Sequence, residues 1–246
     1  MSSRNKFDIG FGKKIRALWL DLSLDHAASA RTFSEAKDEL IGVVRRDNPG
    51  SDAIRKVLVC LNRVWFEPPN YCRVTRDAGL KIYLESRTPQ TRLLLNWGMA
   101  VAAYPFVGAV AETVGRLLKL QGTFGISDIK RRMNERFGDR DFVRRIVRYD
   151  VSSFLDWGVL SKTKAKGEYV AGSVVPVDQS KLVGWLSEAI LHTRNEAFLP
   201  LSQLRQHPML FPFKVREMEF GLSNANPRLH TLRHGHTEDL VMLRES

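Results

Sequence analysis

The stretch DRDFVRRIVRYDVSSFLDWGVL, residues 139 to 160, combines a cluster of arginines with an apolar helix face. A helix turns by about 100° per residue, so the apolar positions Val143 and Val147 mark its buried side. The cations are Arg140 at the helix start, Arg144 on the flank, and Arg145 and Arg148 opposite the apolar side, followed by Ser152. Guanidinium groups match phosphate oxygens and guanine edges with paired donors. We therefore expect this face to bind a nucleic acid.

Further cations precede and follow this stretch. A short helix before it carries Lys130, Arg131 and Arg132, which could contact the flanking backbone. A basic run after it contains Lys162, Lys164 and Lys166, which the period of a strand would place on one side of a hairpin. Two alternatives stay open. The lysines could form an ordinary charged turn, and the arginines a solvated face in which Arg144 and Arg145 pair with Asp141.

The whole chain is basic. Its 246 residues carry a formal net charge of +11, and 43% are hydrophobic and 9% aromatic. This composition supplies ordinary cores and excludes wholesale disorder, while the charge favours a nucleic acid over an anionic membrane as partner. Because Cys60 and Cys72 fit neither a zinc spacing nor a disulfide framework, and no signal peptide is recognisable, we expect a cytoplasmic protein.

The order of elements in residues 104–177 places these cations. We expect a helix over 105–120, a short helix opening at Ser127, and a longer helix over 140–156 capped by Asp139. Two strands around a Lys/Gly turn follow. Helix, short helix, longer helix and basic hairpin is the order of a winged helix-turn-helix. In this motif class the recognition helix, here 140–156, enters the major groove.

Residues 1–103 are expected to form a helical bundle. Candidate helix starts are Ser34, without a capping box, and Ser51. The run from Leu93 to Ala111 has no charged residue and approaches the length of a membrane span. Because Pro105 disfavours helical geometry at the residue before it, we expect two buried helices there and no membrane association.

Residues 178–246 resemble a second, degenerate winged-helix order. We expect an amphipathic helix capped by Asp178, a short helix in PLSQLRQHP, a third in PFKVREMEFGLS and a hairpin turning at HGHT. These helices carry fewer basic residues, so packing or contact with a partner is as good an interpretation as DNA binding.

No catalytic, cofactor or metal site is expected. The sequence lacks a glycine-rich phosphate loop, a GxSxG elbow and an HExxH motif. The histidines of the terminal hairpin share strand parity but have no completing ligands, and the acids near the start of the chain read as a solvated face: His230, His234 and His236, and Glu35, Asp38 and Glu39. We therefore do not expect an enzyme.

Three stretches follow one another before the terminal hairpin: LLLNWGMAVAAYPFVGAVAETV, VRRIVRYDVSSFLDWGVL and KLVGWLSEAILHTRNEAFLPLSQLRQHPMLF. In this layout the chain resembles the BrxA family of the bacterial BREX phage-defence loci. The likeness covers residues 100 onward well and the earlier part only as helical. The resemblance implies a non-enzymatic DNA-binding component of a defence system, with other defence proteins as further partners.

The sequence thus predicts a mainly α protein that binds duplex DNA through residues 104–177. Two other functions fit the same features. A winged-helix transcription regulator would need a palindromic site and a dimer. An assembly adaptor for a larger DNA-modifying complex would use its basic surface only to contact that complex. The sequence does not indicate an oligomeric state.

Overall fold

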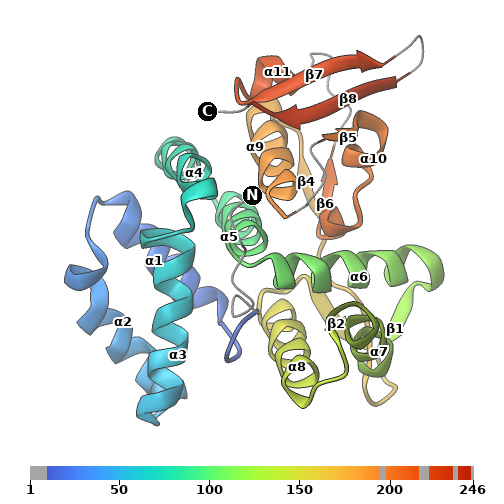
Figure 1. The fold of residues 1–246 in the computed structure, drawn as a ribbon. Coiled ribbons are helices and arrows are strands. Elements are labelled where there is room, and N and C mark those ends of the chain that lie inside the picture. Colours follow the sequence, from blue (N-terminus) through green and yellow to red (C-terminus); the bar gives the residue numbers. More distant parts are fainter. Residues whose placement is uncertain (1–9, 194–197, 216–221, 235–237, 245–246) are drawn as a thin grey trace.

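The protein is mainly α-helical with small sheets, as the sequence predicts, and 65% of it is helical (Figure 1). The computed structural model describes residues 10–193, 198–215, 222–234 and 238–244. Its buried apolar residues form one continuous core that draws on all three predicted segments.

Before Tyr104, the described chain forms a helical bundle. Its α-helices are α1 (Ala17–Ala28), α2 (Phe33–Asp47), α3 (Ser51–Leu61), α4 (Arg73–Glu85) and α5 (Pro89–Ala103). A π-helical turn extends α3 over Asn62–Phe66, and a 3-10 turn over Asn70–Cys72 leads into α4. Figure 1 shows α1, α2 and α3 side by side, with α5 between this bundle and the rest of the chain.

The predicted starts of α2 and α3 are wrong by one or two residues. Thr32, not Ser34, caps α2: its hydroxyl accepts from Glu35 N at 3.3 Å, and the Glu35 carboxylate accepts from Thr32 N at 2.7 Å. A capping box therefore does form, with the cap two residues earlier than expected. Ser51 is the first residue of α3, and Gly50 is the cap, with no side-chain hydrogen bond.

The uncharged run at 93–111 is broken as predicted. Tyr104 leaves helical geometry (φ −125°, ψ 88°), and Pro105 begins the next helix. The two helices meet at 116°, and no single described helix is long and apolar enough to cross a membrane. The two helices meet that length and composition test only when they are counted together as one span, despite the bend between them.

The middle of the chain contains three helices and a small sheet. The elements are α6 (Pro105–Gln121), β1 (Thr123–Gly125), α7 (Ile126–Phe137), α8 (Asp141–Asp156), β2 (Leu160–Lys162) and β3 (Glu168–Ala171). The predicted hairpin β2–β3 is confirmed, and β1 pairs antiparallel with the other edge of β3. The strand β1 was not expected, because three residues are too few to show a period. The helix caps are Gly125 and Arg140, one or two positions from the expected Ser127 and Asp139.

The N-terminal segment, defined here as residues 10–17, ties α8 to the bundle. Backbone N–H groups of this segment donate to three α8 side chains: Phe11 to Asp150 at 3.2 Å, Ile15 to Ser153 at 2.8 Å and Ala17 to Asp156 at 2.9 Å. Since the acceptors are three residues apart, they lie along one side of the helix. A second side of α8 is thus occupied by the chain that leads into α1.

The C-terminal part packs on α5 and α6. Its elements are β4 (Val175–Val177), α9 (Ser180–Leu191), β5 (Phe198–Pro200), α10 (Leu201–Arg205), a 3-10 turn (Pro208–Leu210), β6 (Phe213–Val215), α11 (Leu222–Ala225), β7 (Leu229–His234) and β8 (Glu238–Leu243). β4 and β6 pair in parallel, and the other sheet has the order β5-β8-β7. A Cβ on Gly98 of α5 would stand 2.4 Å from the Trp185 ring, so α5 and α9 touch closely.

Two of the four C-terminal elements are present where they were predicted, the short helix α10 and the paired strands β7 and β8. The hairpin tip at 235–237 lies outside the described residues, so the turn at HGHT stays a prediction. The cap of α9 is Gln179 and not Asp178. The expected helix in PFKVREMEFGLS is wrong at its start, because Phe213–Val215 is a strand that pairs with β4, while 216–221 lies outside the described part.

Candidate nucleic-acid interface

The third side of α8 carries the predicted cations. Val143 and Val147 are buried, and Arg145 and Arg148 are exposed, with Ser152 half-buried one turn later. The guanidinium of Arg145 lies 5.5 Å from the centre of the Phe142 ring. The helical period therefore placed the two outward arginines correctly.

Arg144 is held by carboxylates. It forms ion pairs with Asp139 and with Asp141, the latter at 2.5 Å. Asn134 of α7 also donates to Asp139 at 2.8 Å, so the turn between the two helices is cross-linked. The alternative of pairing with Asp141 thus holds for Arg144 and not for Arg145. Exposed ion pairs contribute little stability, so Arg144 can exchange these carboxylates for a phosphate at small cost.

A cluster of like charges joins α7 to α8. Partial burial, and then the nearby charges of Arg148 and Arg144, lower the pKa of Lys130. Three cations therefore stand close enough for their charges to interact, and Asp139 and Asp141 oppose them by pairing with Arg144. An anion that binds such a cluster offsets the repulsion among several cations at once, which favours its binding.

The other predicted cations, on α7 and at the start of α8, differ in how exposed they are and in how they are paired. Arg131 is exposed and pairs with Glu135 one turn later at 3.5 Å. Arg132 is half-buried, and its Nε is buried without a hydrogen-bond partner. Arg140 is exposed at the cap of α8. Arg131 and Arg140 can reach an outside ligand, whereas Arg132 is constrained by packing.

The hairpin lysines do not follow the predicted strand period. Only Lys162 lies in β2, while Lys164 and Lys166 lie in the turn, where Gly167 has a φ of +78°. The turn curls because Thr163 accepts from Ala165 N at 3.1 Å and donates to Glu168 at 2.7 Å. All three lysines are exposed, and none forms an ion pair with a residue that the structure describes. Figure 1 shows α7, α8 and β2 gathered beside α6.

One cation near α8 was missed from the sequence. The ammonium of Lys13, in the N-terminal segment, lies 5.7 Å from the centre of the Tyr149 ring of α8. No local pattern indicates this contact, because it depends on how residues 10–17 fold back on α8.

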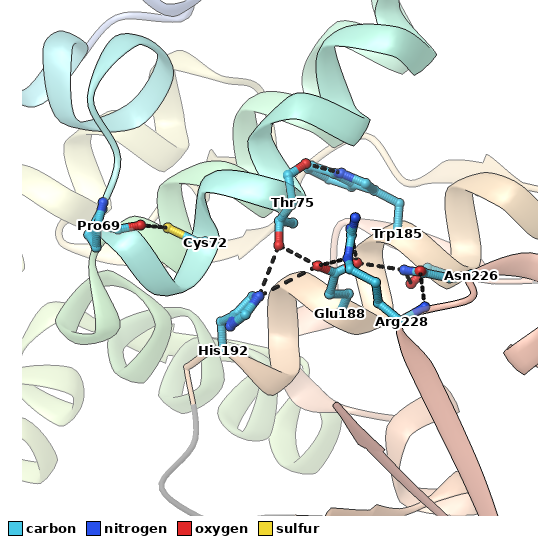
Figure 2. Close-up of polar contacts among 9 residues, drawn as sticks. Pro69, Cys72, Thr75, Trp185, Glu188, His192, Asn226 and Arg228 are labelled. Atoms are coloured by element: carbon cyan, nitrogen blue, oxygen red, sulfur yellow. Dashed lines mark hydrogen bonds and ion pairs between the residues drawn. The ribbon is translucent and has the colours of Figure 1, made fainter. Parts of the chain in front are cut away.

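A buried polar cluster links α4, α9 and the approach to β7 (Figure 2). The carboxylate of Glu188 accepts from Thr75, from Asn226 at 2.6 Å and from Arg228 Nε at 2.9 Å, and lies 3.6 Å from His192 Nε2. Burial acts to raise the pKa of Glu188, but these donors outweigh it and hold the pKa at about 2. A carboxylate held so firmly ionised is suited to joining elements and not to accepting a proton at neutral pH.

The described residues hold no group of three His, Cys, Asp or Glu side chains placed to bind a metal ion. His230 lies in β7 and is half-buried, whereas His236 and the side chain of His234 fall outside the described residues. Comparison of the chain with protein families, with curated proteins and with solved structures gave no significant match.

Proposed function

We propose that the protein binds duplex DNA through α7, α8 and the β2–β3 hairpin, with α8 as the recognition helix of a winged helix-turn-helix. The observation that carries this proposal is that Arg145 and Arg148 face outward from α8, next in the chain to a hairpin whose Lys162, Lys164 and Lys166 are all exposed. A phosphodiester backbone supplies anions at regular spacing, which is what such a cluster needs.

The order of elements supports this assignment. The chain runs α6, β1, α7, α8, β2, β3, and the strands pair in the order β1-β3-β2. In a winged helix the third helix lies in the major groove and the hairpin reaches the adjacent backbone. Here the third helix bears the outward arginines, and the hairpin bears Lys162, Lys164 and Lys166.

The test is binding of a fluorescent duplex to Arg145→Ala/Arg148→Ala. Arg144 is left in place because it cross-links the α7–α8 turn. Hydrogen bonds to charged groups contribute about 1.5–3 kcal/mol each, so affinity should fall at least about tenfold at fixed salt. A matched control is Arg73→Ala/Lys81→Ala, which removes two exposed cations from α4, far from α8 in Figure 1.

Thermal melts show whether both variants fold. If the α8 variant folds and binds like the wild type, α8 is not the DNA-binding helix. If the wild type binds no duplex at low salt, the adaptor alternative replaces the proposal.

The biological setting is a separate part of the proposal. We propose a role in bacterial phage defence, on the resemblance to the BrxA family described above. Similar affinity for unrelated duplexes is expected for such a component, whereas a transcription regulator should prefer one palindromic site and bind it as a dimer. A competition series with unrelated duplexes and a measurement of mass in solution separate the two.

A further inference from the structure

A basic groove lies between α3 and the start of α8. It encloses about 210 Å³, several times the roughly 30 Å³ share of one water molecule. Its lining includes Arg55, Lys56 and Val59 of α3, and Arg63, Tyr104 and Phe142. Three of these residues are cations and none is an acid.

The cations of the groove are held in place by their surroundings. Arg63 donates to Ala103 O at 3.0 Å and lies 5.0 Å from the centre of the Tyr104 ring. The aliphatic stem of Lys56 packs over Gly12, because a Cβ added at Gly12 would stand 3.7 Å from that stem. Asp52 pairs with Lys56 at 2.6 Å and with Arg55 at 2.8 Å, so one carboxylate is shared between two cations at the outer edge. The groove keeps an excess of positive charge.

The groove continues the surface that α8 presents. Phe142 forms part of its wall, and Arg145 of the candidate nucleic-acid interface stacks on the same ring. The N-terminal segment passes between α3 and α8 and adds Lys13 above Tyr149. Asp150 beside the groove is fully buried, and burial raises its pKa well above the usual range, so it adds little negative charge.

We infer that DNA held by α8 continues across this groove, and that a backbone phosphate of the flanking duplex is bound there by Arg55 and Lys56 of α3. The inference rests on the proposed function and extends it, because it adds the N-terminal bundle to the binding surface. The phosphates of the duplex are then contacted on both sides of α8, by the hairpin lysines on one side and by α3 on the other. Phosphate contacts of this kind fix the position of a protein on DNA without reading its sequence.

Charge removal at α3 is the first test. Arg55→Gln/Lys56→Gln keeps the stem over Gly12 and removes two charges, and Arg73→Gln/Lys81→Gln on α4 is the matched control. On a long duplex, the α3 variant should reduce the log–log salt slope by about 0.9, because one phosphate contact is lost. On a duplex trimmed to the shortest length that the wild type still binds, the variant and the wild type should bind alike.

Crosslinking is the second test. Val59 lies in the groove and is 56% exposed, and Val74 on α4 is 52% exposed, so the two positions are equally open. Val59→Cys and Val74→Cys are each labelled with a maleimide photocrosslinker. Burial raises the pKa of the native thiols, to about 11 for Cys60 and about 12 for Cys72, so they should not compete.

Irradiation with bound duplex should crosslink the probe at position 59 and not the probe at position 74. Equal crosslinking at both positions, or none at position 59 while the duplex is bound, would overturn the inference. So would an unchanged salt slope of the α3 variant. The proposed function survives either result if Arg145→Ala/Arg148→Ala still weakens binding, and it fails separately if the wild type binds no duplex.

Discussion

Asp150 offers a direct test of how α8 is fixed in the fold. Its side chain is fully buried, Oδ1 accepts from Phe11 N at 3.2 Å, and Oδ2 has no hydrogen-bond partner. Burial raises the pKa of this carboxyl well above its ordinary 3.8. At pH values between the unfolded and the folded pKa, the folded protein therefore holds a proton that the unfolded chain releases. Asp150→Asn imitates the protonated side chain and keeps an oxygen for Phe11 N.

The sign of the effect follows from proton linkage. A raised folded-state pKa contributes stability that is fully present below the unfolded value of 3.8 and is lost as pH rises through the folded value. Between the two pKa values, the wild type should lose about 1.4 kcal/mol of unfolding free energy per pH unit relative to the variant. Above the folded pKa the difference should level off, with Asp150→Asn the more stable protein.

The assay is urea unfolding from pH 4 to 8.5, followed by tryptophan fluorescence. Asp38→Asn, on the exposed side of α2, removes the same formal charge and corrects for changes in net charge. Asp150→Leu leaves Phe11 N buried without an acceptor and should cost about 1–3 kcal/mol even at the lowest pH. If the stability of Asp150→Asn relative to the wild type does not change with pH, the carboxyl is not a buried proton carrier and the reasoning is refuted.

Three further predictions concern other parts of the molecule. Glu188→Ala should lower the unfolding free energy, measured by urea unfolding, by about 3–5 kcal/mol, because Arg228 loses its buried partner. The stability that Glu188 contributes to the wild type should be lost as pH falls from 4.5 towards 2. Gly115→Ala should lower the unfolding free energy by at least about 1–3 kcal/mol, since a Cβ would stand 1.9 Å from Pro208 O. Gly42→Ala on α2 has nothing within 4 Å of the new Cβ and should raise the unfolding free energy by about 0.5–1 kcal/mol. If Gly115→Ala is as stable as the wild type, the tight contact of α6 with Pro208 is contradicted. Replacing the three hairpin lysines together with glutamine should reduce the log–log salt slope of DNA binding by up to about 2.7, and an unchanged slope would remove the hairpin from the interface.

Periodicity predicted the elements that are long and amphipathic. The outward positions of Arg145 and Arg148 follow from the burial of Val143 and Val147, and the break at Tyr104 follows from Pro105. These features depend on helical geometry and on local sterics, both of which are properties of neighbouring residues.

The features that the sequence did not reveal depend on distant partners. β1 exists because it pairs with β3, and Phe213–Val215 is a strand because it pairs with β4. Thr32 caps α2 because its hydroxyl accepts from Glu35 N while the Glu35 carboxylate accepts from Thr32 N, a reciprocal pair that depends on which residue precedes the helix. The lysine turn left strand geometry because Thr163 and Glu168 bond across it.

The position of α8 explains how a core helix can also carry the proposed DNA contacts. One side packs in the core, a second accepts backbone N–H groups of the N-terminal segment, and the third is free for cations. The segment can lie so close only because Gly10 has no side chain, since a Cβ there would stand 2.3 Å from Ile146. α8 and α3 are consequently held in one arrangement before any ligand arrives. A surface arranged in advance loses less conformational entropy on binding, so two modest sets of phosphate contacts on α8 and α3 can reinforce each other on one duplex.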